Sequence, residues 1–274
     1  MKSVADLRNG LLRELGLLCL FTEHIVHQVW RLLVLVLLAL VFVLFFTRPR
    51  RLANRRARRA LMAVIPVEIQ FEDADPANFS RLDKDHLETL TAEMQKLGFA
   101  CLRDYTTVIP GKPVQRGFAR LLVHRSERCF AEIMATSQAM IGGLPLRVAI
   151  NSYLEDEWEL GTSNVAPKRG HYFQQLPKVL RMRYSDAEPA ELFQRHLARR
   201  AEILEALHIK IHEDLSIDSY FARIRKRMVE RREAMQSHRP LDELSAATTI
   251  AAQRSYEWLG DFPKERERQL VRKN

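Results

Sequence analysis

The residues best suited to chemistry lie in and just after a polar connection that spans residues 163–185. An amide, an imidazole, a phenol and two guanidinium groups occur there close together in sequence: Asn164, His171, Tyr172, Arg181 and Arg183. These groups can donate or accept hydrogen bonds, and guanidinium groups bind carboxylates or phosphates. If the connection folds back on the sheet that precedes it, the five side chains would form a ligand-binding or catalytic site between the two.

A pair of histidines offers metal chemistry. His208 and His212 are four residues apart in a predicted helix, and Glu205 lies one turn before His208. Two histidines at this spacing project from one helix face and can bind a single metal ion. However, His208 falls on the apolar seam of the helix and no third ligand follows at motif spacing. We therefore favour a packing role and predict no metal site.

Two charged segments are better explained as solvated surface. The carboxylates around residues 155–159 could in principle act as acid and base, but they are nearly adjacent in a predicted hairpin turn. The basic stretch over residues 223–227 is balanced by nearby glutamates and is typical of a solvated helix face. The sequence has no G-x-G-x-x-G, Walker A or G-x-S-x-G motif. We therefore assign no catalytic residue and no cofactor.

The positive charge is concentrated in one short segment. The chain of 274 residues has a formal net charge of +9. Seven arginines and no acidic or aromatic residue occur between residues 48 and 59, namely Arg48, Arg50, Arg51, Arg55, Arg56, Arg58 and Arg59. A nucleic-acid-binding domain usually spreads basic residues over a folded face. The pattern therefore argues against nucleic acid as a partner.

An apolar segment precedes this arginine block. Residues 32–46 read LLVLVLLALVFVLFF, and no charge interrupts the sixteen residues between Arg31 and Arg48. As a helix they span about 24 Å of a hydrocarbon core about 30 Å thick, and the flanking arginines can extend to the headgroups. We predict a single transmembrane helix over 32–47 in an inner or plasma membrane.

The arginine block sets the predicted orientation, because basic residues next to a span are retained in the cytoplasm. The domain after residue 48 is therefore predicted to be cytoplasmic, with the arginines contacting anionic lipid headgroups. Three scattered cysteines without a C-x-x-C pair agree with a reducing compartment and exclude a disulfide scaffold. Residues 1–31 carry apolar positions at three- and four-residue spacing and are predicted to form an amphipathic interfacial helix. Glu23, His24 and His27 within it are metal-ligand types, which headgroup-facing positions explain more simply.

The remainder of the chain predicts an α+β fold. An Arg-rich juxtamembrane segment (48–63) leads into a domain over 64–184, where strand patterns surround a helix at 81–97 with Ser80 and Asp83 as a capping box. Short connections favour an antiparallel sheet covered by that helix, with a possible edge strand at 180–184. A helical region over 185–260 follows, with helices predicted over 185–213, 216–238 and 241–259. Residues 261–274 are predicted to be a frayed, charged tail.

These patterns favour an interaction module over an enzyme. We expect a single-span membrane protein of bacterial type that presents a cytoplasmic scaffolding domain, with a protein partner or self-association through the C-terminal helices. Two alternatives are a membrane-tethered enzyme and a regulator that binds a small ligand. Both would use a site between the sheet and the 163–185 connection.

Overall fold

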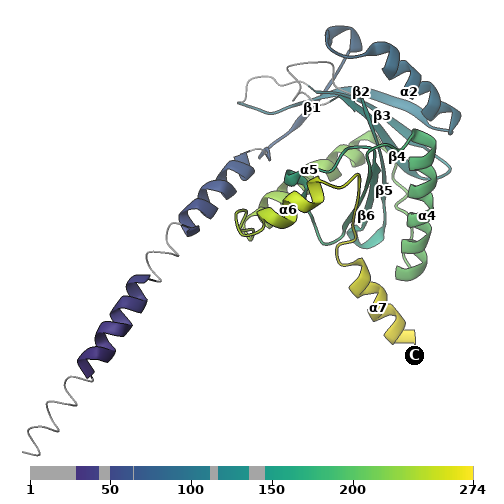
Figure 1. Cartoon of the computed structure of the whole chain (residues 1–274). Coiled ribbons are helices and arrows are strands. Elements are labelled where there is room, and N and C mark those ends of the chain that lie inside the picture. The colour runs from purple at the N-terminus through teal and green to yellow at the C-terminus, as the bar shows by residue number, and fades with distance from the viewer. Residues whose placement is uncertain (1–28, 43–49, 64, 112–116, 136–145, 274) are drawn as a thin grey trace, which may run out of the picture. The chain divides into compact units, whose positions relative to one another are not determined.

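A computed structural model of the chain describes residues 29–42, 50–63, 65–111, 117–135 and 146–273 (Figure 1). It comprises two compact units, residues 1–55 and 56–274. In the first unit, residues 29–42 form a helix whose side chains are all exposed. Among the described residues, no helix is both long enough and apolar enough to cross a bilayer. The predicted interfacial helix up to residue 28, the end of the predicted span and Arg48 lie outside the described residues.

The second unit is built on a sheet in which the described residues form eight strands that lie side by side in chain order. The strands are β1 (Gln70–Asp73), β2 (Ala100–Val108), β3 (Phe118–His124), β4 (Cys129–Ala135), β5 (Arg147–Tyr153), β6 (Glu159–Ser163), β7 (Val179–Tyr184) and β8 (Ser255–Trp258). Neighbouring strands are antiparallel except for β6 and β7, which are parallel. The connection from β6 to β7 must therefore return along the sheet, which a hairpin cannot do.

This connection corrects the prediction of a surface loop over 163–185. It contains the short helix α3 (Arg169–Tyr172), and Phe173 and Leu176 after it are buried. β7 also differs from the predicted edge strand, because β8 pairs with it. β8 lies within the predicted helix 241–259, whose helical part is only α6 (Leu244–Ala251). Four residues carry too little pattern to indicate a strand, and β7 supplies the hydrogen bonds that form it.

The helix α2 (Lys84–Lys96) confirms the predicted helix over 81–97, with one change at its start. Asp83 is the N-cap and accepts a hydrogen bond from the His86 amide at 3.0 Å, so Ser80 does not cap the helix. Gly98 follows with φ of +96°, a conformation that a residue with a Cβ rarely adopts. The helix therefore ends where its glycine predicts.

The helix α4 (Pro189–Leu207) is shorter than predicted at both ends. Ser185 does not cap it, because its hydroxyl donates to the Arg254 carbonyl at 2.9 Å, and Pro189 occupies the first turn instead. At the other end His208 has φ of +55° in the left-handed region, which stops the helix before Glu213.

The last helices complete the second unit. α5 (Ile217–Met235) confirms the predicted helix over 216–238, and the Ser216 hydroxyl caps it by accepting from the Ser219 amide at 3.2 Å. The tail is not frayed, because it forms α7 (Phe262–Lys273), whose first residue is buried beside α4. Two short 3₁₀ turns also occur: η1 (Pro76–Asn78) and η2 (Glu155–Glu157).

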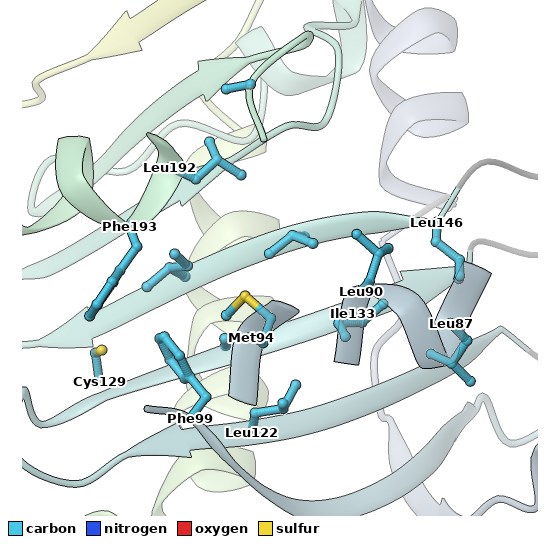
Figure 2. Packing of buried hydrophobic residues seen from close by; sticks show 14 of the residues in the cluster. Leu87, Leu90, Met94, Phe99, Leu122, Cys129, Ile133, Leu146, Leu192 and Phe193 are labelled. Atoms are coloured by element: carbon cyan, nitrogen blue, oxygen red, sulfur yellow. The ribbon is translucent and has the colours of Figure 1, made fainter. Parts of the chain in front are cut away.

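The sheet is covered on both faces (Figure 1). α2 and α4 pack on one face, where apolar side chains interlock in a closed core (Figure 2). α5 packs on the other face against aromatic residues, namely Tyr105, Phe130, Tyr153, Tyr220 and Phe221. Helix on sheet on helix thus buries both faces of every central strand. The helices after residue 185 belong to this single unit, together with the sheet.

Candidate ligand-binding site

A cavity of about 500 Å³ lies between α5 and the sheet face that α5 covers. Its apolar wall includes Ile69, Phe71, Ile109, Phe118, Met134 and Ile224. Its polar lining comprises Tyr105, Glu132, Asn151, Tyr153, Glu159, Tyr220, Arg227 and Arg231. The volume falls within the range of small-molecule sites, which combine apolar walls with a few converging polar groups.

Strand alternation brings the polar groups to this one face. Successive side chains of a strand point to opposite faces, so Glu132 on β4 shares its face with Phe130, which packs beneath α5. The neighbouring Ala131 and Ile133 join the core beneath α2 and α4. Polar side chains therefore lie in a row across a sheet face that is otherwise apolar.

Gly161 on β6 leaves space for a neighbouring side chain within this row of polar residues. A Cβ at this position would lie 2.3 Å from Nη1 of Arg181 and 3.0 Å from Oδ1 of Asn151. Arg181 is the register partner of Gly161 on β7, and Asn151 is its partner on β5. The absent side chain thus leaves space that the Arg181 guanidinium occupies, next to Asn151.

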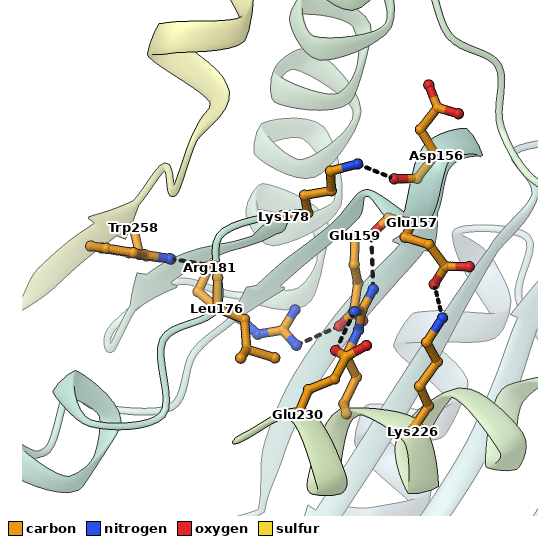
Figure 3. A network of polar contacts seen from close by, with 10 residues as sticks. Asp156, Glu157, Glu159, Leu176, Lys178, Arg181, Lys226, Glu230 and Trp258 are labelled. Atoms are coloured by element: carbon orange, nitrogen blue, oxygen red, sulfur yellow. Dashed lines mark hydrogen bonds and ion pairs between the residues drawn. The ribbon is translucent and has the colours of Figure 1, made fainter. Parts of the chain in front are cut away.

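Glu159 is the centre of a buried ion-pair network (Figure 3). Its carboxylate accepts a hydrogen bond from Arg181, and its Oε2 lies 3.0 Å from Nε of Arg227. Arg227 also contacts Glu230 at 2.6 Å and the Glu157 carbonyl at 2.9 Å. Burial alone would raise the pKa of Glu159, but Arg181 and Arg227 hold that pKa at about 2. These ion pairs hold α5 against β6 and β7.

Glu132 is a second buried carboxyl group with a different environment. Burial raises its pKa, and hydrogen bonds from Tyr105 and Tyr220 oppose that rise. Both tyrosines are themselves buried, and each has a pKa well above its ordinary value because of burial and the nearby carboxyl group. The cavity therefore contains one firmly ionised glutamate and one that is drawn towards its neutral form.

Three arginines beside the network each have one buried nitrogen without a hydrogen bond. The Nε atoms of Arg183, Arg223 and Arg231 are buried without a hydrogen-bond partner in the described part of the chain. Burial, then repulsion from Arg181, lowers the pKa of both Arg183 and Arg231 to about 10, which leaves both charged at neutral pH. A buried polar atom without a hydrogen-bond partner is costly, so a group that accepted hydrogen bonds from these nitrogens would stabilise the fold.

The structure brings together part of the site predicted around residues 163–185. His171 on α3 lies close enough to Arg183 and Arg231 that burial and these charges lower its pKa to about 3. Arg181 and Arg183 point to the same side of β7, as their alternation predicts. Asn164 is not part of the group, because its Oδ1 accepts from the Val148 amide at 2.8 Å. Tyr172 instead packs beside Phe173 and His238.

The residues that line the cavity were mostly missed by sequence reasoning. Glu159 and Arg227 sit in segments predicted to be solvated, yet both are buried against each other. Glu132 and Arg231 were not singled out at all. A charged residue flanked by apolar residues on a strand, as in CFAEIMA, was the available signal for Glu132.

The two histidines do not lie on a single helix, contrary to the prediction. His208 ends α4 in a left-handed conformation, and His212 follows in an extended segment whose amide donates to the Tyr153 carbonyl at 2.9 Å. The two rings therefore do not share one helix face. Within the described residues, no group of three or more potential His, Cys, Asp or Glu ligands is found. Glu23, His24 and His27 lie outside the described residues.

A serine–histidine contact occurs on the opposite sheet face. Ser152 Oγ lies 2.8 Å from Nε2 of His196, and Thr162 Oγ1 lies 3.0 Å from Nδ1. All three side chains are completely buried beneath α4, so no substrate can reach them. Burial, then the charge of Arg200, lowers the pKa of His196 to about 3, so the ring is neutral and can donate from one nitrogen while accepting at the other. We interpret this trio as a structural hydrogen-bond network.

The juxtamembrane arginines lie on a helix over residues 50–63. Five of them are exposed: Arg50, Arg51, Arg55, Arg56 and Arg59. Arg58 is partly buried and donates to the Gln236 carbonyl at the end of α5.

Comparison of the chain with protein-family models, with curated proteins and with solved structures finds no match.

Proposed function

We propose that this chain is a membrane-anchored protein whose sheet domain binds a small amphiphilic anion. The observation that carries the proposal is Arg231, a partly buried guanidinium that lines the cavity and whose buried Nε has no partner in the described residues. A bound anion would supply the missing counter-charge. Of the roles considered from the sequence, this one corresponds to the regulator with a small-ligand site.

The walls of the cavity set the rest of the ligand's character. Phe71, Ile109 and Met134 line one part, while Arg227 and Arg231 line another. An inorganic anion alone would leave the apolar surface in contact with water, and a neutral hydrocarbon would leave the guanidinium unpaired. A ligand with an apolar body and one anionic end satisfies both regions.

The proposed anchor rests on the segment that precedes the sheet domain. Residues 29–42 are predominantly apolar, and their side chains are exposed in the isolated chain, as expected of a surface covered by lipid. The arginines that follow favour a cytoplasmic sheet domain and contact with anionic headgroups. A C-terminal reporter that is active only in an oxidising compartment should stay silent, whereas strong activity would overturn this orientation.

The ligand proposal is tested by direct titration. The full chain in phosphatidylcholine nanodiscs would be titrated calorimetrically with decyl sulfate, an anionic amphiphile, and with decyl maltoside, which has the same tail and no charge. Saturable binding of the sulfate is expected. R231Q should weaken this binding about tenfold or more, as expected for loss of a charge-assisted hydrogen bond.

The matched control is R266Q. Arg266 is exposed on α7 and contacts only Glu202, at 3.5 Å, among the described residues. Its substitution should leave decyl sulfate binding unchanged, and empty nanodiscs correct for partitioning into lipid. Equal binding of the two amphiphiles, or equal binding by R231Q and the natural chain, would contradict the proposal.

A specific observation also favours the interaction module as a second candidate. Leu270 and Val271 on α7 are 57% and 71% exposed. Apolar residues on a surface helix can mark a contact with another protein or a second copy of this chain. Deleting residues 186–274 would also remove β8 and α4, so point substitutions test this better. Crosslinking in native cells should recover a stoichiometric partner or dimer that is lost in L270E/V271E, and an unchanged crosslinking pattern would contradict this candidate.

A further inference from the structure

The two elements that enclose the polar end of the cavity carry an excess of positive charge. Five arginines project from β7 and α5 into this region: Arg181, Arg183, Arg223, Arg227 and Arg231. Within the described residues, the carboxylates that face them are Glu159, Glu230, Glu132 and Glu157, and Glu157 also pairs with Lys226. Even with all four carboxylates ionised, the five arginines and Lys226 leave two positive charges uncompensated.

The uncompensated positive charge is located on particular arginines. Glu159 is occupied by Arg181 and Arg227, and Glu230 is occupied by Arg227. Arg183 lies close enough to Arg231 that the charge of Arg231 helps to lower the pKa of Arg183, as expected of like charges held together. Arg223 lies over the ring of Tyr153 at 4.7 Å from its centroid, and Tyr153 lines the cavity.

His171 adds hydrogen bonding but no charge to this group. Burial, and then the charge of Arg183, keeps its ring neutral, and its Nδ1 accepts from the Lys168 amide at 3.0 Å. To balance the positive charge of these arginines, a ligand must therefore carry about two negative charges on one compact group with several acceptor atoms. A carboxylate or a sulfate monoester carries one charge, whereas a phosphate monoester carries about −1.5 to −2 at neutral pH on three acceptor oxygens.

We infer that the cavity takes a phosphate monoester that bears an apolar tail, with the dianionic phosphate placed against Arg231, which lines the cavity, and close to the charges of Arg183 and Arg223 behind it. This inference rests on the proposed function and narrows its ligand class. Guanidinium groups suit the phosphate because their planar N–H pairs match two phosphate oxygens at once. The tail lies along the apolar wall formed by residues such as Phe71 and Met134.

The test compares four probes on the full chain in phosphatidylcholine nanodiscs at pH 7.5. Decyl phosphate, decyl sulfate and decanoate share one tail and differ in headgroup, and inorganic phosphate has no tail. Decyl phosphate should bind about tenfold or more tightly than the sulfate and the carboxylate, as expected for added charge-assisted hydrogen bonds. Inorganic phosphate should bind more weakly still.

A second measurement at pH 5.5 identifies charge as the cause. The second pKa of a phosphate monoester is about 6, so the probe becomes mainly a monoanion at this pH. The ratio of the affinity for decyl phosphate to the affinity for decyl sulfate should then fall. Decyl sulfate stays a monoanion at both pH values, so a change in its own affinity reports titration of the protein. A preference that persists unchanged at pH 5.5 would overturn the dianion argument.

R183Q separates this inference from the proposed function. Arg183 does not line the cavity wall, so R183Q should still bind decyl sulfate but lose most of its preference for decyl phosphate. R183K retains the charge and should retain much of the preference, with circular dichroism confirming that both variants fold.

The outcomes are distinguishable. Equal affinity for the three decyl anions would overturn the phosphate inference and leave the proposed function standing. Failure of all three to bind would overturn the proposed function itself. Inorganic phosphate binding as tightly as decyl phosphate would overturn the inferred tail and identify free phosphate as the ligand.

Discussion

The two faces of the sheet bury polar groups in opposite ways. Beneath α4, the polar side chains Ser152, Thr162 and His196 are completely buried and hydrogen bonded to one another. Beneath α5, the sheet faces a cavity lined by Arg231, whose Nε is buried without a partner among the described residues. The same strands supply both environments through alternate residues.

This difference separates the requirements of folding from those of function. A fully hydrogen-bonded network in a packed core costs the fold little, and the α4 face is closed around one. An uncompensated charge beside a cavity destabilises the isolated chain, and such sites persist where a ligand completes them. This contrast supports a division in which the α2 and α4 face provides stability and the α5 face carries the proposed ligand site.

The largest loss of stability is expected from a substitution where α5 contacts the sheet. E159Q removes the carboxylate that Arg181 and Arg227 share, leaving two buried guanidinium groups without their main partner. Unfolding by urea should show a loss of about 3–5 kcal/mol, typical of breaking a buried ion pair from one side. E157Q, which breaks only an exposed pair with Lys226, serves as the control and should change stability little. Equal losses in the two variants would contradict the described network.

A core substitution on the other face should cost nearly as much without touching the site. Leu87 of α2 is completely buried in the core beneath α2 and α4. L87A should lower the free energy of unfolding by about 2–5 kcal/mol while leaving the affinity for decyl sulfate unchanged at temperatures where the variant is folded. A specific loss of affinity in folded L87A would show that the two faces are coupled, against the division of roles.

The α4 face should also control the response to mild acid. The pKa of His196 falls from 6.5 to about 3 on folding, so the folded state resists protonation that the unfolded state accepts. This stabilisation is complete above pH 6.5 and is lost as pH falls towards 3, amounting to about 2 kcal/mol between pH 7 and pH 5. His171 acts in the same direction. H196Q should flatten the dependence of unfolding free energy on pH in this window.

The exposed His86 on α2 provides the control for this measurement. H86Q should leave the pH dependence as it is in the natural chain. If H196Q shows the same slope as H86Q, the buried imidazole is not the group that titrates.

The smallest effect is expected at Gly161. The added methyl group of G161A would meet the end of the flexible Arg181 side chain, which can shift slightly at low cost while it keeps its ion pair with Glu159. We expect a loss of stability of about 1 kcal/mol or less, together with a several-fold loss of decyl sulfate affinity, because the polar floor of the cavity is displaced. Unchanged affinity would show that the position of Arg181 does not matter to the ligand.

The sequence predicted individual helices and strands better than it predicted which strands pair with one another. The helix at α2 and most strands follow from caps, glycines and alternation that involve neighbouring residues. β8 and the parallel pairing of β6 with β7 depend on contacts between distant segments, which no local pattern records. The early end of α4 depends on one left-handed residue, His208, whose type does not indicate that conformation.

The candidate site was predicted only in part for the same reason. His171, Arg181 and Arg183 were identified from their side-chain chemistry, and the structure places them near one another. Glu159 and Arg227 were interpreted as solvated because charge runs usually are. Whether a charge is buried depends on what packs over it, and here α5 covers β6 from far along the chain.

The central claim, that Arg231 serves a ligand rather than the fold, is tested most directly by urea unfolding of R231M in nanodiscs, with and without decyl sulfate. Methionine fills much of the same space without a charge. The account predicts that R231M is more stable than the natural chain in the absence of ligand, by about 1 kcal/mol or more, and is no longer stabilised by decyl sulfate. An R231M chain that is less stable than the natural chain, and still stabilised by the anion, would contradict it.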